Sequence, residues 1–208
     1  IERGSIFQSS SDTECIIHLM ARSIQKTIPD RMKDALRLVE GAFSIIAMTR
    51  TKMIGVRDPL GVRPLVLGRR GESWILSSET CGLDIIGAEV VREVEPGEMV
   101  IITRDGVETH RPFEPKRARF CVFEHVYFSR PDSVIAGLSV YEARRRIGVE
   151  LARESGVEAD LVCPIPDSGT PAAIGYSQES GIPLAMGIIR NQYVGRTFIE
   201  PTDQIRDM

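Results

Sequence analysis

Hydrophobic and polar positions in the first 41 residues follow a helical repeat. The apolar side chains recur at spacings of three and four residues, first at Ile16, Leu19, Met20 and Ile24 and then at Met32, Ala35, Leu36 and Val39. Such spacings place side chains on one face of a helix. Ser and Asp residues at 9–12 offer N-cap groups for the first helix, the second begins near Asp30, and Gly41 ends it. The pattern predicts two amphipathic helices.

From residue 42 the helical repeat gives way to short apolar runs separated by turn residues. The runs occupy residues 42–48, 53–56, 64–68, 73–78, 98–103 and 107–111. Asp105 and Gly106, between the last two runs, are a strong hairpin signal. We expect an antiparallel sheet layered on the two helices, with residues 42–48 as a buried strand.

Residues 111–119 interrupt this pattern. They contain two prolines and four basic residues and show no apolar period. This composition is typical of a connector between domains. A long surface loop within a single domain would have the same composition.

The rest of the chain alternates helix and strand. Ser139 and Glu142 form a capping box for a helix that ends at Gly156, with apolar residues at Val140, Ala143, Ile147 and Leu151. An apolar run at 161–165 and another at 184–189 flank a helix at 171–180, which Gly181 ends. Strand, helix and strand in this order predict a βαβ unit with buried parallel strands.

Composition and charge place limits on the class of protein. The 208 residues are 42% hydrophobic and 26% charged, with a net charge of −3, which excludes a disordered chain. No apolar run is long enough to span a membrane, and a pI near 5.7 argues against nonspecific nucleic-acid binding. Four cysteines without a C-x-x-C pair indicate reduced thiols and a cytoplasmic protein.

The loop at 166–170 carries the clearest candidate chemistry. It joins a predicted parallel strand to a helix, and in open α/β folds ligands bind at that edge of the sheet. Its small residues let main-chain N–H groups approach an anion at the positive end of the helix. Asp167 and Ser168 offer oxygen ligands for Mg²⁺, as a phosphate-rich substrate would require. An ordinary N-cap loop without a ligand is the alternative.

For two further segments the sequence allows both a structural and a functional interpretation. Asp12 precedes the first helix and is either a cap or a partner for a substrate ammonium group. Residues 190–197 mix two guanidinium groups, an amide, a phenol and a glycine, so they are either a solvated loop or a lid over an anionic substrate.

Several motifs resemble one family of enzymes. Residues 55–65 (GVRDPLGVRPL) resemble the signature of glutaminase domains in N-terminal-nucleophile amidotransferases, and residues 7–14 resemble an upstream motif of the same domain. Residues 121–133 (CVFEHVYFSRPDS), 166–173 and 191–198 are similar to the phosphoribosyltransferase domain of the glutamine phosphoribosylpyrophosphate amidotransferases. The resemblance covers essentially the whole chain, in order.

The resemblance implies a fold in three parts. Residues 1–112 would be the C-terminal half of an α+β N-terminal-nucleophile glutaminase sandwich, and 113–119 a connector. Residues 120–208 would be the N-terminal half of an α/β type I phosphoribosyltransferase domain. The family carries out the first committed step of purine synthesis, in which ammonia from glutamine displaces pyrophosphate from phosphoribosylpyrophosphate and gives 5-phosphoribosylamine.

The resemblance also assigns roles to residues. Asp12 would hold the α-amino group of glutamine. Asp167, Ser168, Gly169 and Thr170 would receive pyrophosphate, Ser168 beside Mg²⁺. Arg190, Tyr193 and Arg196 would lie on the loop that closes over this substrate, where Gln192 departs from an expected arginine. Cys121 would ligate a [4Fe–4S] cluster in members that carry one. Purine nucleotides are expected as inhibitors and a homo-oligomer as the assembly.

No residue of this chain is expected to be the glutaminase nucleophile. The chain begins at Ile1, and the resemblance places the N-terminal cysteine upstream of it and the acidic phosphoribosylpyrophosphate motif beyond Met208. Cys15 and Cys81 are internal and have no free α-amino group to act as a base. Two other functions stay open: a noncatalytic nucleotide sensor of phosphoribosyltransferase type, and a scaffold module.

Overall fold

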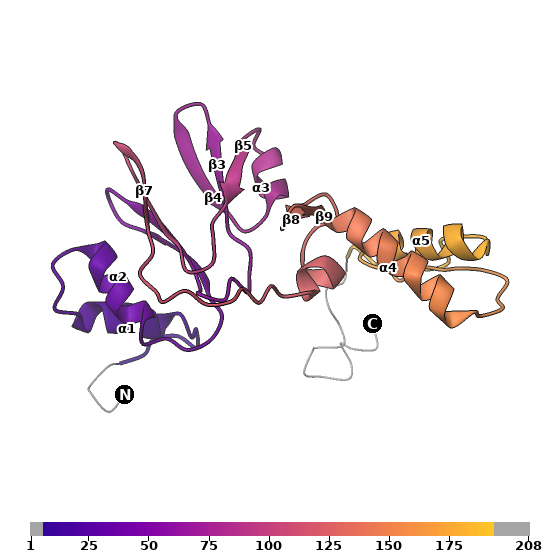
Figure 1. The fold of residues 1–208 in the computed structure, drawn as a ribbon, viewed down its shortest axis with the longest axis horizontal. Helices are drawn as coiled ribbons and strands as arrows, with labels where there is room; N and C mark the ends of the chain where they lie inside the picture. The colour runs from indigo at the N-terminus through magenta and orange to yellow at the C-terminus, as the bar shows by residue number, and fades with distance from the viewer. Residues whose placement is uncertain (1–5, 194–208) are drawn as a thin grey trace. The chain divides into compact units, whose positions relative to one another are not determined.

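The computed structural model describes residues 6–193 and divides the chain into two units (Figure 1). The first unit runs to Val122 and takes in Val134–Ala136, and the second holds Phe123–Ser133 and the chain from Gly137 onward. Residues 113–119, the predicted connector, lie within the first unit. There Phe113 packs edge-on against Phe43, and the Arg119 N–H donates to the Leu60 carbonyl.

The first unit contains the two predicted helices and the predicted antiparallel strands. In chain order its elements are α1 (Glu14–Arg22), α2 (Ile28–Leu36), β1 (Ser44–Met48), β2 (Met53–Arg57), β3 (Val66–Arg70), β4 (Ser73–Ser77), α3 (Thr80–Asp84), β5 (Glu89–Glu93), β6 (Met99–Thr103), β7 (Gly106–His110) and β8 (Val134–Ile135). One sheet has the strand order β1-β2-β6-β7 and a second has β4-β3-β5, and neighbouring strands in both are antiparallel.

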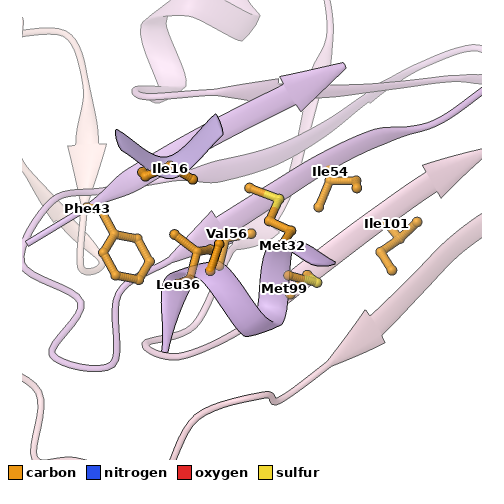
Figure 2. Packing of buried hydrophobic residues seen from close by; sticks show 9 residues of the cluster. Ile16, Met32, Leu36, Phe43, Ile54, Val56, Met99 and Ile101 are labelled. Atoms are coloured by element: carbon orange, nitrogen blue, oxygen red, sulfur yellow. The ribbon is translucent and has the colours of Figure 1, made fainter. Parts of the chain in front are cut away.

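The four-stranded sheet packs on α1 and α2 through one of its faces. Ile16 of α1 and the α2 residues Met32 and Leu36 meet Ile54 and Val56 of β2 and Met99 and Ile101 of β6 (Figure 2). The strand residues in this core are two positions apart because alternate side chains of a strand point to the same face.

The intervening residues of the same strands face the second sheet. Val100 and Ile102 of β6 pack with Leu65, Leu67 and Val94. On the far side of the second sheet, Val66 packs against Leu83 and Ala88, from α3 and the turn that follows it. The first unit therefore has four layers: helices, sheet, sheet and helix. This arrangement confirms the predicted layering of sheet on helix and adds a second sheet.

Three details of the predicted elements are wrong. Ile24 lies beyond α1, which ends because Ser23 adopts an extended conformation, and its side chain is exposed. Val39 lies beyond α2, although it packs against the same core. The strand predicted as buried at 42–48 begins at Ser44 and exposes Ile46 and Met48, because β1 is at the sheet edge and packs through one face only.

The second unit is built on two closely packed helices. Its elements are a π-helical turn, η1 (Glu124–Phe128), a short strand, β9 (Leu138–Ser139), and the helices α4 (Val140–Ser155) and α5 (Thr170–Ser180). Ser139 caps α4 by accepting the Glu142 N–H, and left-handed glycines, Gly156 and Gly181, end both helices as predicted. Every helix in the described residues is too short or too polar to cross a membrane.

Glycines set the distance between α4 and α5. A Cβ atom on Gly148 of α4 would lie 1.8 Å from the Ala172 carbonyl oxygen, and one on Gly175 of α5 would lie 2.0 Å from the Arg145 oxygen. The backbones of the two helices therefore approach more closely than any side chain at these positions would allow.

The predicted buried strands of the second unit are reduced to a single bridge. Val162 and Leu184 form one parallel pair, so the predicted βαβ order and direction are confirmed. Leu161, Ile165 and Ile189 are nevertheless exposed, as are Ile147 and Leu151 on α4. Parallel strands are normally covered on both faces, and within residues 6–193 no further strand lies beside this pair.

Candidate functional site

The loop at 166–170 forms a tight turn that leads directly into α5. The Gly169 N–H donates to the Ile165 carbonyl at 3.1 Å, the Thr170 N–H donates to the Asp167 carbonyl at 3.3 Å, and the Pro166–Asp167 peptide bond is cis. A Cβ atom on Gly169 would lie 2.7 Å from the Ile165 oxygen, so this position requires glycine. The loop thus lies at the positive end of α5, where an anion would be stabilised.

The structure brings Asp167 and Arg190 together, 23 residues apart in the chain. The Arg190 Nη1 atom lies 3.3 Å from Asp167 Oδ2, and the two side chains are 67% and 73% exposed. The bridge between Val162 and Leu184 places the segment that carries Arg190 beside the loop. Two of the predicted phosphate-binding residues are therefore neighbours.

The other predicted residues of the closing loop are not brought to this site. Tyr193 is fully exposed, and its N–H donates to the Asn191 side chain at 2.9 Å. Arg196 lies outside the described residues.

The loop contains two side chains with oxygen atoms of the kind that Mg²⁺ accepts as ligands, Asp167 and Ser168. Mg²⁺ is commonly held by one or two carboxylates, substrate phosphates and water. Asp167 supplies an exposed carboxylate, and the next residue in the chain, Ser168, is half-buried. Among residues 6–193 no three His, Cys, Asp or Glu side chains gather in a group that could hold a metal by themselves.

Cys121, the predicted cluster ligand, is half-buried at the end of the first unit, and its N–H donates to the Val62 carbonyl. An iron–sulfur cluster requires several thiolates, and the described residues around Cys121 do not supply them. Among the described residues Cys121 is therefore a single candidate ligand, its role in a cluster stays a prediction from the resemblance, and no chemistry is derived from a cluster.

Asp12 does not cap α1. The N-cap residue is Thr13, which makes no side-chain cap hydrogen bond, and the exposed Asp12 carboxylate accepts only the Thr13 hydroxyl, at 3.3 Å. The structure therefore contradicts the capping alternative for Asp12, and its role in binding an ammonium group stays a prediction.

Glu14 organises the segment that carries Asp12, and the sequence analysis missed this role. Its carboxylate accepts the N–H groups of Gln8 and Ser9, both at 2.8 Å, and the Ser9 hydroxyl at 2.6 Å. These bonds, led by the Ser9 hydroxyl, lower the pKa of Glu14 to about 2. His18 lies 3.5 Å from the same carboxylate. The run of Ser residues before Glu14 was the available signal.

A buried arginine, Arg57, stabilises the conformation of the signature segment at 55–65. Arg57 is 4% exposed, and its guanidinium donates to the carbonyls of Arg63, Val94 and Gly61 at 2.8, 2.7 and 3.0 Å. Burial lowers the pKa of Arg57, and Glu93, at 3.6 Å, acts in the opposite direction. The planar five-donor fork of arginine is needed to reach three carbonyls.

Asp58 holds the turn that follows β2. Its carboxylate is fully buried and accepts the N–H groups of Leu60 at 2.9 Å and Val62 at 3.2 Å. The turn bends at Gly61, whose φ of +61° suits glycine and whose Cβ atom would lie 2.6 Å from Pro96. Arg57 and Asp58 are therefore buried residues that hold the main chain of the loop in place.

The first unit of the chain is similar to a known family of domains. A family described as "Glutamine amidotransferase domain" matches residues 1–84. The layered α/β sandwich of the first unit is accordingly that of a glutamine amidotransferase domain.

Proteins that match almost the whole chain are more specific than the domain family. The chain is 56% identical over 211 residues to the amidophosphoribosyltransferase of Rhizobium etli, covering 99% of this chain and 42% of that protein. It is 48% identical over 205 residues to the amidophosphoribosyltransferase of Bacillus subtilis, covering 99% and 43%. A solved structure of the B. subtilis glutamine phosphoribosylpyrophosphate amidotransferase with ADP and GMP matches with a TM-score of 0.90 and 48% identity, covering 99% of this chain and 45% of that one.

Over 99% of its length the chain is therefore similar to amidophosphoribosyltransferases. It spans about two-fifths of the length of these relatives. A relative from Arabidopsis thaliana, 50% identical over 210 residues and matched over 99% of this chain and 37% of its own length, is named as chloroplastic. Cytoplasmic location therefore stays a prediction for this chain.

Proposed function

We propose that the protein containing this chain forms 5-phosphoribosylamine from phosphoribosylpyrophosphate, with nitrogen taken from glutamine. Glutamine, water and phosphoribosylpyrophosphate would yield glutamate, pyrophosphate and 5-phosphoribosylamine. One observation carries the proposal: Asp167 and Arg190 lie together at an exposed loop at the start of α5. That loop follows, in one chain, a glutamine amidotransferase sandwich.

In this proposal the second unit is part of a type I phosphoribosyltransferase domain. The N-terminal end of α5 and the loop at 167–170 would receive the pyrophosphate of the substrate. Mg²⁺, bound to phosphate oxygens, would be held by Asp167 and the Ser168 hydroxyl and would neutralise charge that develops on the leaving pyrophosphate. Gly169 keeps the main chain close enough to Ile165 for this turn to exist.

The first unit would bind glutamine. The exposed Asp12 carboxylate would pair with its α-amino group, and the bonds of Glu14 to residues 8 and 9 would fix the segment on which Asp12 lies. The N–H groups of Cys15 and Cys81 are parts of peptide bonds, so neither residue can be the nucleophile of an N-terminal-nucleophile mechanism.

Regulation and assembly belong to the same proposal. The B. subtilis relative was solved with ADP and GMP, and we expect purine nucleotides to inhibit this protein as well. A homo-oligomer and the [4Fe–4S] ligand role of Cys121 stay predictions from the resemblance.

Replacing glutamine with ammonium separates the two halves of the reaction. In the full-length protein, Asp12→Asn should raise the KM for glutamine by roughly ten- to a hundredfold, the value of one charge-assisted hydrogen bond. Activity with ammonium as the nitrogen source should be unchanged. Asp105→Asn, in the exposed turn between β6 and β7, is the matched control and should leave both activities unchanged.

A change at the phosphate loop should affect both assays. Ser168→Ala should reduce the rate with glutamine and with ammonium alike, since pyrophosphate leaves in both. If the purified protein binds phosphoribosylpyrophosphate but releases neither glutamate nor pyrophosphate, the sensor alternative replaces this proposal. If it binds no pyrophosphate with Mg²⁺, the scaffold alternative does.

A further inference from the structure

His18 carries a buried ring nitrogen that the proposed function does not use. The residue lies on α1, one turn after Glu14, and its Nε2 atom is buried and makes no hydrogen bond within the described residues. Glu14 Oε1 lies 3.5 Å from this nitrogen, too far for a well-formed hydrogen bond. A buried polar atom without a partner costs free energy, so the placement of the ring beside Glu14 calls for an explanation.

Glu14 and His18 together hold the segment that precedes α1. Four residues apart on a helix, the two side chains lie on the same face. The Phe7 ring packs edge-on against the His18 ring, with the two centroids 4.7 Å apart. The N–H groups of the two residues that follow Phe7 donate to the Glu14 carboxylate. Residues 7–14 therefore form a loop that is closed against one face of α1, called the 7–14 loop below.

Asp12 lies inside the 7–14 loop. Its carboxylate accepts the Thr13 hydroxyl at 3.3 Å, and its carbonyl accepts the Cys15 N–H at 3.1 Å, which joins its main chain to the first turn of α1. The contact with Thr13 is between neighbours in the chain and does not tie the carboxylate to the rest of the fold. The direction of the Asp12 side chain therefore depends on how the loop is held.

We propose that His18 is a positioning residue for glutamine, and that through Phe7 and Glu14 it holds the 7–14 loop in the conformation that presents Asp12. This inference rests on the function proposed above. A loop that is ordered before the substrate arrives loses less conformational freedom on binding, and the affinity is higher as a result. His18 acts through the loop and takes no part in the chemistry.

The test measures glutamate release from glutamine by the full-length protein. His18→Ala removes the contacts with Phe7 and with Glu14 and should raise the KM for glutamine by roughly three- to tenfold, the value of one aromatic pair with a weak polar contact. The kcat should be unchanged, because a substitution that only weakens binding raises KM alone. An unchanged KM would overturn the inference.

A double-mutant cycle shows whether His18 acts through the loop. Phe7→Ala should also raise the KM, and the double variant should raise it by less than the product of the two single effects, since both substitutions remove the same contact. Effects that multiply would mean independent roles and would overturn the inference.

His110→Ala is the matched control. His110 also lies near a carboxylate, that of Glu108 at 3.6 Å, but it is on β7 and outside the 7–14 loop. This variant should leave the KM unchanged. A rise equal to that of His18→Ala would mean that loss of any histidine in the first unit weakens glutamine binding, and the inference would be overturned.

A second variant covers the case in which His18→Ala does not fold and kcat falls with the amount of folded protein. His18→Phe keeps a ring against Phe7 and removes the nitrogen that faces Glu14. It should raise the KM by about twofold, the value of a weak contact between side chains one helical turn apart. An unchanged KM in His18→Phe would overturn the role given to the nitrogen.

The outcomes also separate this inference from the proposed function. If Asp12→Asn raises the KM for glutamine and His18→Ala does not, the inference is wrong and the proposed function stands. If Asp12→Asn leaves the KM unchanged, the glutamine-binding role of this segment fails, and the inference fails with it. If wild-type protein releases no glutamate from glutamine, both the inference and the proposed function fail.

Discussion

Replacing Gly148 with alanine should weaken the packing of α4 on α5. The new Cβ atom would lie 1.8 Å from the Ala172 carbonyl oxygen, whereas real Cβ atoms stay beyond 3.0 Å from such atoms, so the helices would have to separate by about 1.2 Å at this point. Overpacking of this kind costs about 1–3 kcal/mol. Because the obstacle is main chain and cannot move aside like a flexible side chain, the upper end of that range applies.

Helix propensity acts in the opposite direction. Alanine is favoured over glycine inside a helix by about 1 kcal/mol. The net expectation is a loss of about 2 kcal/mol in the local stability of the helix pair, which corresponds to roughly a thirtyfold change in its opening equilibrium.

Hydrogen exchange measured by mass spectrometry on the full-length protein reports this local stability. Peptides from α4 and α5 should lose roughly thirtyfold in protection, while peptides from β2 and β6 in the first unit should be unchanged. Glu154→Ala, on an exposed position of α4, is the control and should have little effect. Equal or greater protection in Gly148→Ala would refute the close approach of the two helices.

Three further expectations concern the first unit. Arg57→Lys should destabilise it by about 3 kcal/mol in urea unfolding, since an ammonium group cannot reach the three carbonyls that the guanidinium satisfies. A carbon-13 titration should place the Glu14 carboxyl pKa near 2. The stability that Glu14 adds over Glu14→Gln should be complete above pH 4.5 and should disappear as the pH falls from 4.5 toward 2, because the folded state binds fewer protons in that window. Ile54→Ala, fully buried in the core beneath α2, should cost about 2–5 kcal/mol in the same unfolding measurement.

Local patterns were enough to predict most elements of the first unit. Residues such as Met99 and Ile101 repeat at the spacing of a strand, and Asp105–Gly106 marks the turn between β6 and β7, which pair as expected. Ser139 and Gly156 cap α4 as predicted, because a cap acts on a backbone only a few residues away. The predicted caps of the first two helices are wrong: Thr13, not a residue at 9–12, is the N-cap of α1, and α2 ends at Leu36, before Gly41.

Patterns failed where burial depends on a neighbouring layer. Residues 161–165 are as apolar as a buried strand, yet Leu161 and Ile165 are exposed, since a run of apolar residues does not say what covers it. Ile46 of β1 is exposed for a related reason: its strand lies at the edge of a sheet.

At the candidate sites the sequence supplied the residues and the tertiary structure supplied their partners. Asp12, Asp167 and Arg190 could be singled out from residue type, position and family resemblance. Only the folded chain pairs Asp167 with Arg190 or turns Arg57 inward onto three carbonyls. Spacing along the chain fixes which face of a helix or strand a side chain occupies. Contacts between residues distant in the chain leave no repeat in the sequence, so they exist only once the layers have packed.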